Sequence, residues 1–165
     1  LGRCGIAWGE RGIVSVSFPE ECDEATCARL RRRAVGAVEA TPPDFIEQII
    51  SDIKALFVGE VRSFEGVQLD REGQPEFDLC VFDETSKIGP GETKTYGEIA
   101  RALGDVALSR RVGQALGRNP FPIIVPCHRV VGAKGNMTGF SAPGGTETKY
   151  NLLKIEGALE PDLFD

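Results

Sequence analysis

The chain has 165 residues, of which 41% are hydrophobic and 27% are charged, a composition typical of a soluble globular protein with one large domain or two small ones. It contains no apolar run near the roughly 20 residues that a membrane-spanning helix needs, and its N-terminus lacks the pattern of a secretory signal peptide. Its five cysteines form no Cys-x-x-Cys pair, and its single histidine leaves no recognisable zinc pattern. We therefore expect a cytoplasmic protein with reduced thiols, no bound metal and no membrane contact.

The net charge of −6 is unevenly distributed along the chain. Residues 1–90 carry ten basic and seventeen acidic side chains, whereas residues 91–165 carry nine basic and eight acidic ones. Seven of those basic residues lie between positions 94 and 134, where only two residues are acidic. The overall charge argues against a nucleic-acid partner, but the uneven distribution indicates that the second half would make any contact with a polyanion.

The first forty residues predict a β-hairpin followed by a helix. Short apolar runs at residues 5–8 and 13–18 flank a Gly-Glu-Arg-Gly turn, which is the pattern of a hairpin. The stretch at residues 22–38 is rich in arginine, and its apolar residues recur at helical spacing as Leu30, Ala34, Val35 and Val38. We interpret its arginines as the solvated face of a helix rather than a binding site.

A second helix and a short strand complete the N-terminal half. The Thr-Pro-Pro-Asp sequence at residues 41–44 interrupts the chain, and apolar residues then recur along one side of a predicted helix over residues 45–58. A strand is expected near residues 67–69, and residues 71–75 are interpreted as a linker. Residues 1–74 show no catalytic constellation, so we predict that they form a small α/β domain with a supporting role.

The second half begins with a predicted helix at residues 77–86 and continues as a helix-turn-helix. Thr95 and Glu98 have the spacing of a capping box, which predicts the start of a helix. A Gly-Asp turn separates that helix from another over residues 109–119. Two helices joined by a short turn are the outline of a helix-turn-helix.

The helix over residues 109–119 has two different faces. One face supplies the core with Val112, Ala115, Leu116 and Asn119, and the other presents Arg110, Gly113, Gln114 and Gly117. Each glycine inside a helix costs about 1 kcal/mol relative to alanine. The glycines therefore indicate a backbone that lies close to something, which is either another segment of the protein or the backbone of a nucleic acid.

A cysteine beside the only histidine is the strongest chemical signal in the sequence. Cys127 and His128 follow an apolar run at residues 123–125 that predicts a buried strand. Free cysteine has a pKa of about 8.5 and is mostly protonated near neutral pH, so a nucleophilic thiol needs an acceptor for its proton. An adjacent imidazole commonly supplies that acceptor. The alternative is a core cysteine next to a surface histidine.

These segments resemble the O6-alkylguanine-DNA alkyltransferase family, the methylated-DNA–protein-cysteine methyltransferases. The resemblance covers roughly residues 75–157, and its most specific block is the Pro-Cys-His-Arg-Val-Val sequence. The matching blocks are residues 95–100, 110–120, 126–131, 136–139 and 149–157. The resemblance implies an α/β N-terminal domain over residues 1–74, with ribonuclease H-like strands and helices. It also implies a mainly α, winged helix-turn-helix domain over residues 75–165.

The resemblance also implies a function, which is the direct reversal of DNA damage. Members of the family bind the minor groove of double-stranded DNA and rotate the alkylated guanine out of the base stack. They then transfer its O6-alkyl group irreversibly to their cysteine, in a single turnover and without a cofactor. We therefore expect a suicide methyltransferase that acts as a monomer on O6-alkylguanine, with O4-alkylthymine as a second candidate substrate.

Four residues match the catalytic positions of the family. Cys127 is the expected nucleophile and alkyl acceptor. His128 is expected to take its proton through a water molecule, and Glu156 to orient and stabilise the resulting imidazolium. Asn119 matches the residue that ties the recognition helix to the active-site turn.

Five residues match positions beside the substrate. Tyr96 is expected to help turn out the nucleotide and to hydrogen-bond the base, and Thr138 to donate to O6 from its hydroxyl or backbone. The carbonyl of Val130, with that of Cys127, is expected to accept from the guanine amine. Lys149 is expected beside the pocket, and Met137 stands where some relatives have a tyrosine against the base.

The expected DNA contacts lie on the helix-turn-helix. Arg110 matches the arginine that fills the gap left by the extruded base, and the other residues expected at the DNA are Thr95, Gly113, Gln114, Gly117 and Arg118. Some relatives bind zinc in the N-terminal domain with cysteines and histidines. This chain has cysteines there but no histidine, so we expect no zinc.

Three other functions are weighed against this one. A non-catalytic, alkyltransferase-like protein that binds the lesion and recruits other repair proteins would lack the reactive cysteine, whereas Cys127 is present. A winged-helix transcriptional regulator would leave the cysteine, histidine and glutamate without a role. A thiol hydrolase would use a Cys-His pair but would turn over repeatedly.

Overall fold

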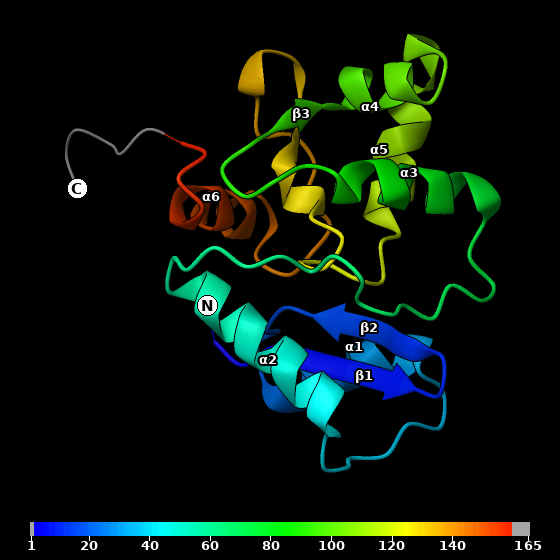
Figure 1. The fold of residues 1–165 in the computed structure, drawn as a ribbon, viewed down its shortest axis with the longest axis vertical. Helices are drawn as coiled ribbons and strands as arrows, with labels where there is room; N and C mark the ends of the chain where they lie inside the picture. The colour runs from blue at the N-terminus through cyan, green and yellow to red at the C-terminus, as the bar shows by residue number, and fades with distance from the viewer. Residues whose placement is uncertain (1, 160–165) are drawn as a thin grey trace.

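The computed structural model describes residues 2–159 (Figure 1). The N-terminal half starts with the predicted hairpin, in which β1 (Gly5–Gly9) pairs antiparallel with β2 (Gly12–Ser17). Gly12 has a φ of 112°, and a Cβ at this position would lie 2.2 Å from the carbonyl oxygen of Gln68. Only glycine fits this turn, because the position combines a left-handed backbone with a close approach of another segment.

The strand predicted at residues 67–69 is reduced to a single bridge. Leu69 pairs with Ile13 in parallel, and Ile13 N donates to Gln68 O at 2.9 Å. Asp70 N in turn donates to Ile13 O at 2.7 Å. The N-terminal sheet of the described chain therefore has two strands and one bridge, and the ribonuclease H-like description of this half stays a prediction.

Two helices flank the hairpin. The first, α1 (Asp23–Arg33), is shorter than the helical pattern in the sequence indicated. The prediction that Val35 and Val38 continue its apolar face is wrong, because they are 89% and 82% exposed. The chain leaves the helix after Ala34, and Gly36 follows with a φ of 80°. The second helix, α2 (Asp44–Phe57), confirms its prediction and buries Ile46, Ile49, Ile53 and Leu56.

The second half is mostly helical. Its helices α3 (Glu76–Ser86), α4 (Tyr96–Ala102) and α5 (Ser109–Gly117) confirm the predicted helix and the helix-turn-helix, with a short 3₁₀ turn η1 (Val106–Leu108) between the last two. Then come η2 (Cys127–Arg129), β4 (Val130–Val131), η3 (Ala133–Gly135) and α6 (Gly145–Ile155). The two-residue strand β3 (Lys94–Thr95) pairs in parallel with β4, which connects the start of α4 to the segment just after the cysteine.

The apolar run at residues 123–125 is buried as predicted, but the prediction of a strand there is wrong. Ile123 has a φ of 76°, and the segment forms a turn whose Val125 N donates to Phe121 O at 2.8 Å. Cys127 N continues the local bonding by donating to Val125 O at 2.8 Å. The left-handed backbone at Ile123 and a hydrogen bond that spans four residues are features of a tight turn, which an extended strand cannot contain.

One hydrophobic cluster joins the two halves. It includes Val16 and Phe18 from the hairpin segment, Ile46 from α2, Phe82 from α3 and Ile124 from the buried turn. A backbone hydrogen bond of 2.9 Å from Val16 N to Pro120 O links β2 to the segment that follows α5. The division into domains at residues 74 and 75 stays a prediction, and residues 160–165 of the second domain lie outside the described chain. No helix within residues 2–159 has the length and hydropathy to cross a membrane.

Candidate active site

Cys127 lines a cavity of about 270 Å³ between α5 and the segment at residues 139–142. Helix α5 contributes Gly113, Leu116 and Gly117 to the cavity, and Tyr96 at the start of α4 lies beside them. The remaining lining comes from the 139–142 loop, which comprises Gly139, Phe140, Ser141 and Ala142. Cys127 as a residue is therefore partly exposed and lines the cavity.

His128 and Glu156 meet although 28 residues separate them in the chain. His128 is 0% exposed, and the Glu156 side chain is 1% exposed. The distance between His128 Nε2 and Glu156 Oε1 is 2.9 Å. The other ring nitrogen, Nδ1, has no hydrogen-bond partner among the described residues. A carboxylate can only accept, so Nε2 carries the ring proton in the neutral imidazole and Nδ1 holds the free lone pair.

Arg129 completes this buried group, although its role was not predicted from the sequence. Its Nε and Nη2 donate to the two oxygens of Glu156 at 3.0 and 2.8 Å. Its Nη1 donates to the carbonyl of Ile88 at 2.6 Å. The guanidinium fixes the position of the Glu156 carboxylate and keeps it ionised, and the carboxylate in turn orients the imidazole. The only sequence signal for this role was the position of Arg129 beside the histidine.

Burial and neighbouring charges shift the pKa values of Cys127, His128 and Glu156 in different directions. Burial raises the pKa of the Cys127 thiol, while a hydrogen bond from Asn119 and the charge of Lys149 act against it. Burial lowers the pKa of His128, opposed by its hydrogen bond to Glu156. Burial alone would raise the pKa of Glu156, but hydrogen bonds from His128 and Arg129 lower it to about 2. The resting site therefore contains a neutral thiol, a neutral imidazole and an ionised carboxylate.

Asn119 lies just after α5 and bonds to the turn that leads to Cys127. Its Nδ2 donates to Val125 O at 3.0 Å, and its Oδ1 accepts from Phe121 N at 2.9 Å. Both bonds fix the buried turn that ends at Cys127. The amide thus ties the end of α5 to the active-site turn by two hydrogen bonds.

Helix α5 has the two faces that its sequence predicts. Val112, Ala115 and Leu116 are buried, whereas Arg110 and Gln114 are exposed. A Cβ at Gly113 would lie 3.8 Å from the Tyr96 ring, and one at Gly117 would lie 3.9 Å from Ser141 Oγ. These are ordinary contact distances, so close packing within the protein does not require glycine at either position. Both glycines line the cavity, and Arg110 makes no hydrogen bond or ion pair within the described chain.

Of the five residues expected beside the substrate, Tyr96 lines the cavity, whereas Val130, Met137, Thr138 and Lys149 are not among its lining residues. The Tyr96 hydroxyl lies 3.3 Å from the carbonyls of both Thr138 and Gly139. Lys149 is fully buried, and its Nζ donates to Val130 O at 2.5 Å and Thr138 O at 3.3 Å. The backbone N–H of Thr138 donates to Asn136 O at 2.9 Å.

These contacts engage groups that were expected to bind the base. The carbonyl of Val130 accepts from Lys149, and the N–H of Thr138 is bonded within its own loop. The Thr138 side chain and Met137 are not part of the cavity lining. Lys149 also lies 5.7 Å from the centre of the Tyr96 ring. Its charge favours the thiolate form of Cys127 by lowering the pKa of that thiol.

Two residues expected at the DNA have structural partners. Thr95 caps α4, with Thr95 Oγ1 accepting from Glu98 N at 3.1 Å and Glu98 Oε2 accepting from Thr95 N at 2.7 Å, which confirms the capping box. Arg118 donates from Nε and Nη2 to the two oxygens of Asp78 at 2.9 Å each. The Asp78 side chain is 2% exposed, so this pair joins α5 to α3. The pairing was not visible in the sequence, because 40 residues separate the two.

No set of three or more His, Cys, Asp or Glu side chains within residues 2–159 could hold a metal ion. All five cysteines are unpaired thiols. Cys127 is thus a free thiol on the cavity, with the imidazole of His128 as its neighbour in the chain.

Comparisons with known proteins place this chain in a family. The family model for "6-O-methylguanine DNA methyltransferase, DNA binding domain" matches residues 76–158. A methylated-DNA–protein-cysteine methyltransferase of Methanosarcina acetivorans is 46% identical over 115 residues, which are 70% of this chain and 71% of that protein. The protein of the same name from Methanothermobacter thermautotrophicus is 32% identical over 153 residues, covering 93% of this chain and 78% of that protein.

A solved structure extends the similarity in three dimensions. The crystal structure of Mycobacterium tuberculosis OGT in complex with DNA matches with a TM-score of 0.72 and 33% identity. The match covers 93% of this chain and 85% of that chain. The similarity therefore reaches both halves of the molecule.

Proposed function

Because this chain belongs to the methylated-DNA–protein-cysteine methyltransferase family, we propose that it repairs O6-alkylguanine in double-stranded DNA by taking the alkyl group onto Cys127. The observation that carries the proposal is the Cys127 sulfur on a cavity beneath α5, next to the buried pair of His128 and Glu156. O4-alkylthymine offers an equivalent exocyclic alkyl oxygen, so it is a second candidate substrate.

The first step brings the lesion to the cavity. A base inside a duplex hides the bond between O6 and the alkyl carbon, so the nucleotide has to be rotated out at a cost of a few kcal/mol. Helix α5 enters the minor groove, where its glycines allow close approach and the unpaired, exposed Arg110 fills the space left by the base. Gln114 projects from the same exposed face. Contacts with the phosphate backbone of DNA carry no information on its base sequence. DNA binding should therefore depend on the salt concentration more than on the base sequence.

The second step moves the thiol proton. His128 Nδ1 takes it from Cys127 through a water molecule, because Nε2 is already bound to the Glu156 carboxylate. The imidazolium that forms is stabilised by the same carboxylate, whose pKa of about 2 keeps it ionised. Asn119 and Lys149 favour the thiolate at the moment of transfer.

The third step transfers the alkyl group. The thiolate attacks the alkyl carbon, the S–C bond forms, and the O6–C bond breaks with its electron pair passing to the guanine. A proton returned to the purine ring leaves ordinary guanine. Burial raises the pKa of the Tyr96 phenol, so it remains a hydrogen-bond donor at the pocket edge. The thioether that results is stable, and one protein molecule therefore repairs one lesion.

Mass spectrometry tests this proposal. The protein is incubated with duplex DNA that contains one O6-methylguanine, and the intact protein is then weighed and digested. We expect a gain of one CH₂ per chain, confined to the peptide that contains Cys127. Binding to the lesion without a mass change would instead support a non-catalytic lesion-binding protein. Repeated release of the methyl group as a free product would support a hydrolase.

A further inference from the structure

The 139–142 loop forms one wall of the active-site cavity, opposite Gly113 and Gly117 of α5. It has no regular secondary structure, and Gly139 has a φ of 49°. Its backbone has few bonds of its own within the described chain. Gly145 N donates to Ala142 O at 3.0 Å, and the Tyr96 hydroxyl reaches Gly139 O. Its position therefore depends on contacts from other segments.

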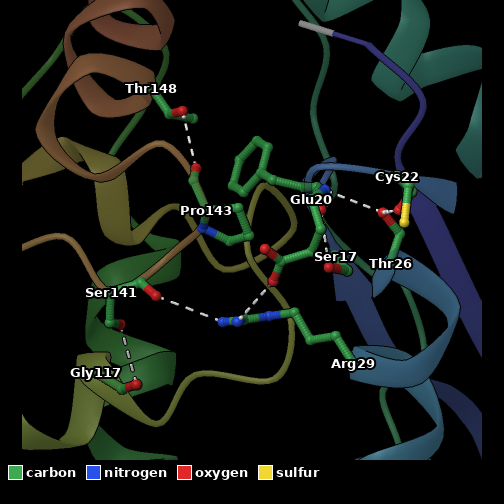
Figure 2. A network of polar contacts seen from close by, with 10 residues as sticks. Ser17, Glu20, Cys22, Thr26, Arg29, Gly117, Ser141, Pro143 and Thr148 are labelled. Carbon is green, nitrogen blue, oxygen red and sulfur yellow. Dashed lines mark hydrogen bonds and ion pairs between the residues drawn. The ribbon is translucent and has the colours of Figure 1, made fainter. Parts of the chain in front are cut away.

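Two of those contacts come from the N-terminal half. The ring of Phe140 lies 6.1 Å from that of Phe18, centre to centre, with 59° between their planes. Phe18 follows β2 and is fully buried. On the other side, Arg29 of α1 reaches across to the loop, where its Nη2 donates to Ser141 O at 3.4 Å (Figure 2).

The arginine is itself held in place. Its Nη1 donates to Glu20 Oε1 at 3.1 Å, so the guanidinium lies between a carboxylate and the loop carbonyl (Figure 2). Glu20 N in turn donates to Thr26 Oγ1 at 3.0 Å, which fixes the segment before α1. A guanidinium that is oriented by one partner loses less freedom when it binds the next.

The loop passes this restraint on to the recognition helix. Ser141 Oγ donates to the carbonyl of Gly117 at 3.1 Å, at the C-terminal end of α5 (Figure 2). Ser141 is thus bonded to the N-terminal half through its carbonyl and to α5 through its hydroxyl. The width of the cavity between the 139–142 loop and α5 therefore depends on the contacts of Ser141 with both the N-terminal half and α5.

We propose that Arg29 and Phe18 are positioning residues that set the size of the O6 substituent this protein accepts, by holding the 139–142 loop against the cavity. The inference rests on the proposed function, and it gives the N-terminal half a part in substrate choice. With the loop held, the cavity of about 270 Å³ favours a small alkyl group on the flipped base. With the loop released, the wall can move outward and admit a bulkier group.

The test compares two substrates in three proteins. Rate constants for transfer are measured with the same duplex carrying either O6-methylguanine or O6-benzylguanine, for the wild type, Arg29→Ala and Arg32→Ala. Arg32 is the matched control, because it is exposed on the same helix and makes no hydrogen bond or ion pair within the described chain. We expect the benzyl-to-methyl rate ratio to rise about fivefold in Arg29→Ala, the factor that corresponds to one lost hydrogen bond. It should stay at the wild-type value in Arg32→Ala.

Hydrogen exchange of the loop provides a second readout. Amides of residues 139–142 should exchange faster in Arg29→Ala than in Arg32→Ala or the wild type. Glu20→Gln retains Arg29 but removes its charged partner, so it should shift the ratio in the same direction by a smaller factor. This variant carries the test if Arg29→Ala fails to fold.

The outcomes separate the two proposals. A wild-type protein that transfers neither group overturns the proposed function and the inference with it. A wild-type protein that transfers both groups, with equal ratios in all variants and unchanged loop exchange, overturns the inference alone. An equal slowing of both substrates in Arg29→Ala also overturns it, because it would show general support rather than selection by size.

Discussion

Replacing Glu156 with glutamine removes the charge that His128 and Arg129 share, with almost no change in volume. In the folded protein the pKa of this carboxyl falls from its ordinary value of 4.5 to about 2. At 1.36 kcal/mol per pKa unit, the shift corresponds to about 3 kcal/mol of stabilisation near pH 7. Removing one partner of a buried ion pair costs about 3–5 kcal/mol of stability, a range that includes the stabilisation worked out from the pKa shift. We therefore expect Glu156→Gln to lower the free energy of unfolding by about 3 kcal/mol.

Urea denaturation near pH 7 measures this loss, with Glu147→Gln as the control. Glu147 is exposed in the first turn of the same helix, and its variant should unfold within about 0.5 kcal/mol of the wild type. Cys127 in Glu156→Gln should also react more slowly with thiol reagents, because the hydrogen bond that raises the pKa of His128 is weakened. A stability loss below about 1 kcal/mol, with unchanged thiol reactivity, would show that the Glu156 charge supports neither the fold nor the His128 base.

The lowered pKa of Glu156 also determines in which direction the stability of the folded protein changes with pH. A carboxyl group whose pKa is lower in the folded than in the unfolded protein stabilises the folded state. The stabilisation is complete when the pH is above the unfolded-state pKa, and it is lost as the pH falls through the folded-state pKa. The advantage of Glu156 over the glutamine variant should therefore shrink as the pH falls from about 4.5 toward 2. The comparison is made in a His128→Asn background, so that the imidazole does not titrate in the same range. A stability difference that stays flat over this range would show that the carboxylate is not held by Arg129.

Three further substitutions test separate parts of the account. Arg110→Ala should slow repair in duplex DNA at least about tenfold more than reaction with free O6-benzylguanine, because only the duplex requires extrusion; equal losses would exclude that role. Arg118→Ala should lower the free energy of unfolding by about 2 kcal/mol, since it leaves the buried Asp78 carboxylate unpaired while the arginine is itself 55% exposed. Weaker DNA binding with unchanged urea stability would instead place Arg118 at the DNA. Gly12→Ala should cost about 3 kcal/mol in urea denaturation, because its Cβ would overlap Gln68 O at a left-handed position; a loss under about 1 kcal/mol would show that the turn can shift.

The helices were largely predictable, because each carries its pattern locally. The apolar spacing within α2, the capping box at Thr95 and the two faces of α5 all lie within single elements. The errors occur where long-range packing decides. Val35 and Val38 continue a helical spacing after the helix has ended, and the buried run at residues 123–125 forms a turn around Ile123, whose φ is 76°.

The site was predictable only in part. Cys127 and His128 are neighbours in sequence, and Glu156 was placed with them through the resemblance of its segment to the family. The role of Arg129 could not be inferred, because its contact with Glu156 spans 27 residues. Arg29 and Ser141 are separated by 112 residues, and no local pattern predicts such a contact. The bonding of Val130 O to Lys149 likewise depends on how α6 packs against the segment after the cysteine.

The most direct test of the account is the number of lesions repaired per protein molecule. A fixed amount of protein is titrated with an increasing excess of duplex DNA containing O6-methylguanine, and the restored guanine is counted at completion. We predict a plateau at one guanine per chain, with Cys127→Ala giving none while still binding the lesion. A yield that keeps rising with substrate, or repair by Cys127→Ala, would contradict it.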